Sequence, residues 1–365
     1  MQPKTEIEFK VHSYVLYMQE RYDAYRRFLN SEELPIYSGD FVQDARTLEL
    51  AEWRRRGGHG AYITFPDQMM SNMYVAEIAP GLSLKPQRQM FEEIVLGVSG
   101  RGATSLWWDE GGPRHTFEWQ RGSLFSIPLN CNYEHMNVSG TEPARLLSLT
   151  NQPVIWELFR DPEFVFGSTH QFRDRFDADV ADFFSRPGKY LTQYYGGILD
   201  TSFIADLRKV QLVSREKRGK GTMNMYIHLA GSTQFAHISQ FPVGTYKKAH
   251  RHGVGAHVYT LDSTGYTLMW REGEEPHRYD WSEGSIISPP AGYWHQHYNT
   301  GKEPAKFVAL HASVAMGGEQ EGSTANVEQL DYADEDAKLR EMYVAECERN
   351  GVEVTMEPTT PSRAR

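Results

Sequence analysis

Apolar and polar residues alternate with a period of two in two separate stretches of the chain. The first runs from about Gly60 to Trp156, with runs such as AYITF, NMYVAEIA and EEIVLGVSG. The second runs from Met225 to Ser313, with runs such as AHVYTLD, YTLMW and AKFVALHASV. Gly, Pro, Asn and charged residues separate these runs, as is typical of turns between strands. We therefore predict two blocks of short strands, repeated after roughly 150 to 160 residues, as in duplicated barrels.

Helical periodicity occurs outside these blocks. Residues 9–30 and residues 326–350 place apolar side chains at helical spacing among charges, and residues 157–222 resemble a partly helical connector. The pattern predicts five parts, in chain order: a helical arm (1–58), an N-terminal barrel (59–160), a linker (161–224), a C-terminal barrel (225–315), and a helix with a tail (316–365).

The composition favours a globular protein that acts on small molecules. Hydrophobic residues make up 40% of the chain, the formal net charge is −10, and no basic stripe is present, which argues against nucleic acid or a membrane as partner. The chain has no long apolar run, and its two cysteines, Cys131 and Cys347, are too few for a disulfide framework. We therefore expect a cytoplasmic location.

Histidines in the second block are the strongest chemical signal. His250 and His252 are two residues apart, so on a strand both can point into one cavity, and His295 on a returning strand can reach across a small barrel. His257 has an odd offset from His252, and it joins them only if the glycines between the two shift the strand phase. We predict one divalent transition metal per chain, bound by His250, His252, His257 and His295.

The segments around these histidines resemble the two motifs of the cupin superfamily. The second motif, G(X)5PXG(X)2H(X)3N, matches at Gly284, Pro290, Gly292, His295 and Asn299. The first, G(X)5HXH(X)3,4E(X)6G, matches at Gly244, His250 and His252, has His257 where glutamate is expected, and closes one residue late at Gly265. The resemblance implies a cupin barrel with a four-histidine variant of the metal site.

The first block has the same skeleton without the histidines. Its corresponding residues are Gly81, Gln87, Gln89, Glu93 and Gly100, followed by Gly122, Pro128, Asn130 and Tyr133. Amides are poor ligands for these metals, so this block resembles a cupin barrel that has lost its site. The resemblance implies a mainly all-β bicupin of two double-stranded β-helix (jelly-roll) barrels, with an N-terminal helical arm, a partly helical linker and a C-terminal helix.

Open coordination positions on a metal favour an enzyme. We expect a mononuclear non-haem Fe(II) dioxygenase that acts on a small organic acid, aromatic or hydroxylated, with dioxygen as second substrate; Mn, Ni, Zn and Cu are alternative metals. The two-barrel plan is similar to gentisate-type ring-cleaving dioxygenases, although those are expected to keep three histidines in the N-terminal barrel. The alternatives are a redox-neutral isomerase, decarboxylase or hydrolase, and a non-catalytic small-molecule-binding cupin.

Four further residues are candidates for the substrate pocket. His297 shares the strand parity of His295, and His237 lies in an alternating run, so both can face the cavity. Tyr259 and Trp270 can shape an aromatic pocket, although barrels also use such residues for packing. Cupins often pair barrels across sheet edges, so we also expect a homo-oligomer.

Overall fold

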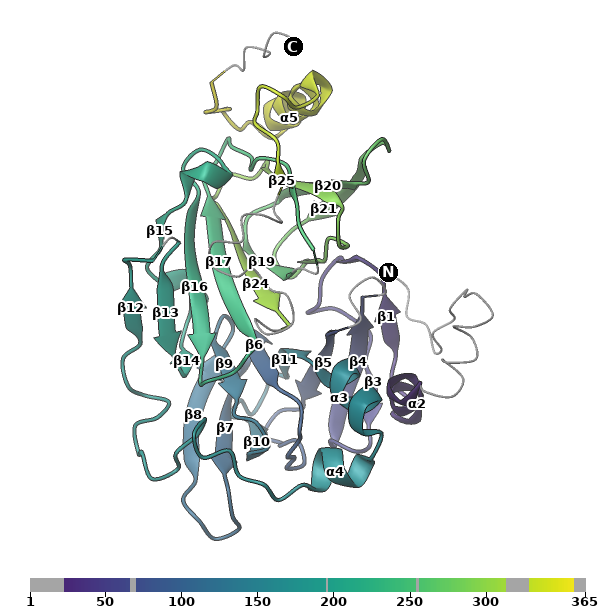
Figure 1. Ribbon diagram of the computed structural model, residues 1–365, viewed down its shortest axis with the longest axis vertical. Coiled ribbons are helices and arrows are strands. Elements are labelled where there is room, and N and C mark those ends of the chain that lie inside the picture. The colour runs from purple at the N-terminus through teal and green to yellow at the C-terminus, as the bar shows by residue number, and fades with distance from the viewer. Residues whose placement is uncertain (1–22, 66–69, 195, 254–255, 313–327, 358–365) are drawn as a thin grey trace.

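Two β-barrels, one after the other along the chain, make up most of the protein (Figure 1). The structure, a computed structural model, describes residues 23–65, 70–194, 196–253, 256–312 and 328–357. In each barrel a large sheet faces a smaller one, as the alternation of apolar and polar residues predicts.

The first barrel has an eight-stranded sheet in the order β1-β4-β5-β11-β6-β9-β14, with β3 beside β4, and a three-stranded sheet in the order β10-β7-β8. The bounds of the large sheet are β1 (Ile36–Ser38), β3 (Ala51–Trp53), β4 (Gly58–Thr64), β5 (Asn72–Ile78), β6 (Glu93–Ser99), β9 (Leu124–Ile127), β11 (Ala144–Thr150) and β14 (Phe203–Ile204). Those of the small sheet are β7 (Arg101–Trp107), β8 (His115–Gln120) and β10 (Asn132–Asn137).

The second barrel has a nine-stranded sheet in the order β12-β13-β16-β17-β24-β19-β22-β2, with β15 beside β16, and a five-stranded sheet in the order β21-β20-β23-β18-β25. The bounds of the large sheet are β2 (Phe41–Val42), β12 (Lys189–Leu191), β13 (Ile198–Thr201), β15 (Val213–Ser214), β16 (Met223–Leu229), β17 (Phe235–Phe241), β19 (His257–Asp262), β22 (Ile286–Ile287) and β24 (Ala305–His311). Those of the small sheet are β18 (His250–Arg251), β20 (Gly265–Trp270), β21 (His277–Trp281), β23 (Trp294–Asn299) and β25 (Glu328–Gln329).

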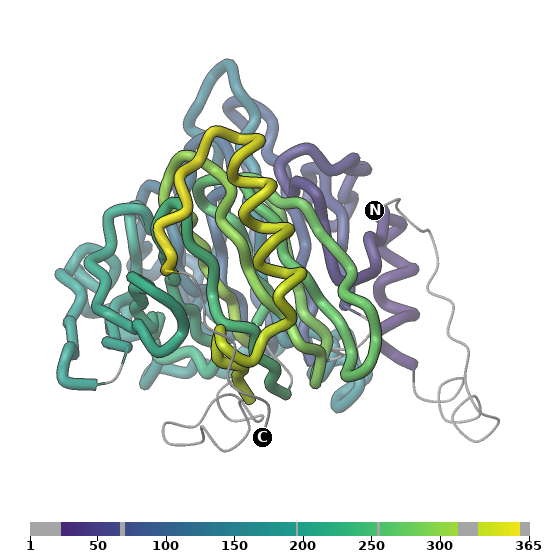
Figure 2. Tube along the Cα trace, turned by 90° about the horizontal axis from the view of Figure 1, so that it is seen from above, coloured from purple at the N-terminus to yellow at the C-terminus, as the bar shows by residue number. Residues whose placement is uncertain are grey.

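The helices lie outside the barrels. They are α2 (Ala24–Ser31), α3 (Gln152–Phe159), α4 (Pro162–Gly167), α5 (Ala337–Asn350) and the 3-10 turns η1 (Leu207–Lys209) and η2 (Glu216–Arg218). In Figure 2 the yellow helix α5 lies across the strands of the second barrel, where Tyr343 and Cys347 pack on Tyr246, Tyr266 and Tyr298. None of the helices in the described ranges is long and apolar enough to span a bilayer.

The two barrels are repeats of one structural unit. This unit is longer than either stretch of alternating apolar and polar residues in the sequence. β1 begins at Ile36 and β13 at Ile198, 162 positions later, and both pair in parallel with the next long strand. β11 and β24 begin at Ala144 and Ala305, 161 positions apart. The repeat therefore includes parts of the regions expected as arm and linker.

Each barrel is completed by a short strand from within the other repeat. β2, which lies between β1 and β3 of the first barrel in the chain, pairs with β22 of the second barrel, and β14, which lies between β13 and β15 of the second, pairs with β9 of the first. Gly284 permits the close approach beside β22: its φ is +94°, and a Cβ there would lie 2.2 Å from Asp44 Oδ1. The parts expected as arm and linker thus contribute strands to both sheets.

The large sheets of the two barrels pack face to face and share one apolar core. Side chains from both sheets fill this inter-barrel core, among them Ile63, Val75, Leu147, Ile238 and Leu310. The opposite face of each large sheet lines the interior of its own barrel. Because successive side chains of a strand point to opposite faces, the parity of a residue decides between inter-barrel core and barrel interior.

His257 lies on the inter-barrel face. It is paired with Leu310, a member of the shared core, and its ring stacks on Phe65 of the first barrel at 3.9 Å between centroids. Its Nε2 and Nδ1 atoms are 2.7 and 2.8 Å from the hydroxyls of Ser71 and Ser288. Burial lowers the pKa of His257 to about 3, so the ring is neutral and joins the two barrels by hydrogen bonds.

We predict that His257→Ala destabilises the protein. The substitution leaves a cavity and removes the ring to which two buried hydroxyls are hydrogen-bonded, which should cost about 2 to 4 kcal/mol of unfolding free energy. Urea denaturation at pH 7 measures this. His228→Ala is the matched control because His228 is half exposed on β16. Equal midpoints for His257→Ala and wild type would contradict the prediction.

The stabilities of wild type and His257→Ala should respond differently to acid. Because the folded pKa of His257 is depressed, protonation of this residue in the unfolded state removes its stabilising contribution as the pH falls from about 6.5 towards 3. The alanine variant has no such group. The difference in unfolding free energy between wild type and His257→Ala should therefore shrink between pH 7 and pH 4, and a constant difference would count against the assignment.

Candidate metal centre

His250, His252 and His295 lie together in the second barrel. One ring nitrogen of each lies within 4.8 Å of the others. The fold explains the grouping: His250 on β18 is directly paired with His295 on β23, and His252 follows two residues later. The ring centroid of His295 is 4.1 Å from that of His250 and 4.9 Å from that of His252. These residues are three of the four expected from the motifs.

Backbone contacts determine which nitrogen of each of the three rings carries the hydrogen. The Nδ1 atoms of His250, His252 and His295 lie 3.2, 3.0 and 3.1 Å from the carbonyl oxygens of Lys248, Gly253 and Tyr293, respectively. A carbonyl oxygen only accepts hydrogen bonds, so each Nδ1 carries the hydrogen and each Nε2 keeps its lone pair. This is how metal-binding histidines are usually oriented, and the donor set fits a divalent first-row transition metal.

The electrostatics of the group also suit a metal. Burial lowers the pKa values of His250 and His295 well below 6.5, so both rings are neutral near pH 7, as ligands must be. Three neutral imidazoles do not compensate the charge of a divalent ion, which preserves its Lewis acidity and its attraction for anions.

The structure does not bring His257 to this group, which departs from the four-histidine set expected above. By strand pairing, His257 opposite Leu310 corresponds to Ile94 opposite Leu149 in the first barrel, and all but the histidine are core residues between the barrels. The counterpart of Glu93 is therefore Ala256, which packs inside the second barrel. Of the two glycines expected to shift the strand phase, Gly253 and Gly255, the second lies outside the described ranges.

Two of the expected pocket residues face the barrel interior. His297 lies two positions after His295, with its ring centroid 5.9 Å from that of His295, and its Nδ1 atom is 2.7 Å from the hydroxyl of Thr267. His237 on β17 lies further along the interior, with its Nδ1 atom 2.9 Å from His311 Nε2. Burial lowers the pKa values of both His297 and His237 well below 6.5.

The other two expected pocket residues lie elsewhere. Tyr259 shares the parity of His257 and packs in the inter-barrel core. Trp270 is on the outer face of the small sheet, next to the cluster under α5, and stacks on Trp294. Their strands alternate as expected, but both residues occupy the faces that point away from the barrel interior.

One interior residue was not singled out from the sequence. Lys247 is buried, and its Nζ atom donates a hydrogen bond to the hydroxyl of Ser239 at 2.6 Å. Counted back from His250, its odd offset would place it outside the barrel, but residues 247–249 are not in a regular strand, so the parity rule fails there. Alignment of the two repeats, which puts Leu84 at this position, would have identified it.

In the first barrel the residues at the motif positions form a closed hydrogen-bond network. The Glu93 carboxylate accepts hydrogen bonds from Gln89 Nε2 at 2.6 Å, the Ser148 hydroxyl at 2.7 Å and the Tyr133 hydroxyl at 2.9 Å. Gln87 donates to Gln89 and lies 3.0 Å from the Tyr133 hydroxyl. The motif residues thus satisfy one another's hydrogen-bonding groups.

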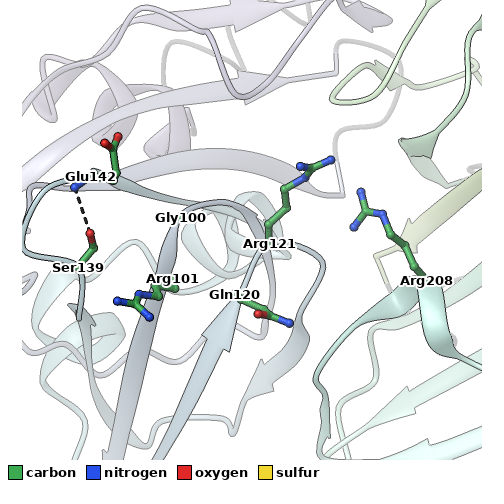
Figure 3. Close-up of a pocket in the computed structure, with 7 residues that line it drawn as sticks. All are labelled: Gly100, Arg101, Gln120, Arg121, Ser139, Glu142 and Arg208. Carbon is green, nitrogen blue, oxygen red and sulfur yellow. Dashed lines mark hydrogen bonds between the residues drawn. The ribbon is translucent and has the colours of Figure 1, made fainter.

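A separate cavity of about 540 Å³ lies near the junction of the barrels (Figure 3). Arg121 and Arg208 on its wall both donate to the Glu283 carboxylate, at 2.7 and 2.8 Å, and Arg208 also donates to Asp262 at 2.9 Å. These arginines already have carboxylate partners, so the cavity borders an ionic contact between the barrels and offers neither of these two charges to a ligand.

Comparisons with known proteins agree with this geometry. A family model described as Cupin domain matches residues 237–311, which include all three histidines. No match to the chain was found among curated protein sequences.

Solved structures show the fold of the whole chain. The chain is similar to the oxalate decarboxylase of Lactobacillus farciminis in a formate complex, with 10% identity, a TM-score of 0.51 and coverage of 96% of this chain and 99% of that one. It is also similar to a variant of Bacillus subtilis oxalate decarboxylase, with 12% identity, a TM-score of 0.52 and 89% coverage of both chains. A third similar structure, of the same Bacillus enzyme, is titled for its Mn(II) centres, with 12% identity, a TM-score of 0.51 and 89% coverage of both chains.

Identities this low establish the fold and leave the reaction open. The fold predicted from the sequence is confirmed, with two barrels and helices confined to their outside. The chain therefore has a two-barrel, bicupin fold, and its residues 237–311 match the cupin domain.

Proposed function

We propose that the second barrel binds one divalent metal ion through His250, His252 and His295 and acts on a small organic acid, with redox-neutral decarboxylation as the first candidate reaction. The observation that carries this proposal is the group of three buried or half-buried imidazoles with ligand atoms within 4.8 Å of one another. Three protein ligands leave coordination positions for substrate, as catalytic rather than structural sites do. Manganese is the first metal to test, because a similar fold is known with Mn(II) centres.

A metal ion bound there would supply Lewis acidity towards a substrate carboxylate or carbonyl oxygen. The protein's own residues would do the rest. The backbone carbonyls behind the three rings hold the ligands in one orientation. His297, neutral and fixed by Thr267, lies beside the site and can accept or deliver a proton at Nε2. The apolar residues of the barrel interior, such as Phe241 and Phe307, exclude water from the substrate.

The dioxygenase expected from the sequence is the second candidate. The same three-histidine donor set suits Fe(II), and its open positions can hold both a substrate and dioxygen. The similarity to oxalate decarboxylases favours the redox-neutral reaction as the first to assay, although identities of 10% and 12% support only the fold. The balance between oxygen consumed and carbon dioxide released distinguishes the two.

We predict that the metal depends on His252. Protein incubated with Mn²⁺ and desalted should hold about one ion per chain, and His252→Ala should weaken binding more than about 100-fold, because one of three ligands is lost. Elemental analysis and calorimetric titration with Mn²⁺ measure this. His228→Ala and His257→Ala are matched controls that should keep the ion. Equal losses of Mn²⁺ affinity in His257→Ala and His252→Ala would contradict the three-ligand site and support the four-ligand one.

We predict that the manganese-loaded protein releases carbon dioxide from a small carboxylic acid without a matching uptake of oxygen. The assay follows both gases in a closed vessel with oxalate and a panel of small keto and hydroxy acids. His295→Ala should abolish turnover because it removes a ligand. One oxygen molecule consumed for each substrate lost, with Fe(II)-loaded protein, would instead identify a dioxygenase.

A further inference from the structure

The interior of the second barrel contains a buried cation without a carboxylate partner. Lys247 is 8% exposed, and among the described residues its one polar side-chain partner is the Ser239 hydroxyl, at 2.6 Å. The rings of Phe241 and Phe307 flank the ammonium group, with centroids 5.2 and 5.6 Å from Nζ. A buried ammonium group is costly unless a negative charge compensates it, and a single hydroxyl does not.

The strands around this lysine offer no such charge. β16, β17, β20, β23 and β24 contain no Asp or Glu. The one acidic residue of β19, Asp262, accepts a hydrogen bond from Arg208 at the inter-barrel side instead. The indole N–H of Trp281, whose ring lies 5.0 Å from Phe307, also has no acceptor in the described part of the chain. The interior thus has two donors, the ammonium group and this indole N–H, without a carboxylate from these strands to accept from them.

Lys247 lies close to the candidate metal centre. Its backbone N–H donates to the carbonyl of His297 at 3.0 Å, so it lies beside β23, the strand that carries His295. The ring of His297 links the two places: its centroid is 5.9 Å from that of His295 and 5.2 Å from that of Phe307. A molecule that occupies the barrel at the metal centre therefore has the ammonium group close by.

The first barrel provides an internal comparison. Leu84 and Lys247 each follow the residue of an equivalent bridge, Ser83 to Met136 and Tyr246 to Tyr298. Ala76 and Ser239 are each the fifth residue of the equivalent strands β5 and β17. The barrel without the histidines thus has a leucine and an alanine where the barrel with them has a lysine and a serine. Packing alone is satisfied by the apolar pair, so the polar pair serves another purpose.

We propose that Lys247, positioned by Ser239, binds the carboxylate of the substrate at the end remote from the metal, so that the substrate is an organic acid with a second oxygen group for the metal. This inference rests on the proposed function, because it takes the metal centre to be the substrate site. An ammonium group in a water-poor interior binds a carboxylate strongly and orients it. The metal would then receive the other end of the molecule.

The test compares diacids with their monoamides on manganese-loaded protein. Oxalate, malonate, succinate and glutarate are titrated calorimetrically against oxamate, malonamate, succinamate and glutaramate, which replace one carboxylate by a neutral group of the same shape. For the chain length that fits, wild type should prefer the diacid at least tenfold. Lys247→Leu should bring this ratio close to one while the affinity for Mn²⁺ and for the monoamide stays within about twofold.

Two further variants keep the test decisive. Lys209→Met removes the same charge from an exposed side chain that pairs with Asp206, away from the barrel interior, and should keep the wild-type ratio. Lys247→Leu combined with Ser239→Ala reproduces the pair already present in the first barrel, and serves if the single variant folds poorly. An unchanged ratio in the lysine variants, or no diacid preference in wild type at any length, overturns the inference. Absence of Mn²⁺ binding in wild type overturns the proposed function instead.

The preference should also depend on pH. Burial lowers the pKa of Lys247 to about 7, so the ammonium form, which binds the carboxylate, is lost as the pH rises through 7. His237 and His297, which face the same interior, are already neutral, and Arg215 and Arg218 nearby stay charged. The diacid preference of wild type should therefore fall between pH 6 and pH 8.5, and that of Lys247→Leu should not change. A preference independent of pH in wild type would contradict the role of Lys247.

Discussion

The packing of the two large sheets against each other is the interaction on which the rest of the structure depends. It buries both faces of each sheet, one in the shared core and one in a barrel. Every residue on these strands is therefore assigned to one of two interiors by its parity alone. The chemistry of the second barrel follows from this assignment, because His237 and Ser239 point into the barrel while Ala236 and Ile238 fill the core between barrels.

Much of the fold could be predicted from the sequence, because alternation with turn residues is a local signal. The two barrels and the grouping of His250 and His252 with the distant His295 all follow from spacing within regular strands and from the motif. The short strands β2 and β14 could not be predicted, because two residues carry no periodicity and their partners are far away in the chain. The same holds for the extent of the repeat, which pairing rather than hydrophobicity defines.

The parts of the site that the sequence misplaced depend on where strand parity holds. His257 and Tyr259 have the chemistry of a ligand and a pocket residue, but both lie on the inter-barrel face of β19, which is the face that the odd offset between His252 and His257 gives without a change of phase. Lys247 was overlooked for the converse reason, since an irregular segment turns an outward position inward. Parity assigns residues to faces reliably within a regular strand but not across an irregular segment. Alignment of the two repeats identifies equivalent residues in both kinds of segment.

The short exchanged strands have a consequence for how the protein can be divided. Because β2 lies between β1 and β3 of the first barrel but pairs in the second, and β14 lies between β13 and β15 of the second barrel but pairs in the first, no single cut between the barrels leaves both with all their strands. A half expressed alone would expose a backbone edge as well as the apolar face of its large sheet. The two barrels thus share strands as well as a core, and a half separated by gene fission would first require a new way to close that edge.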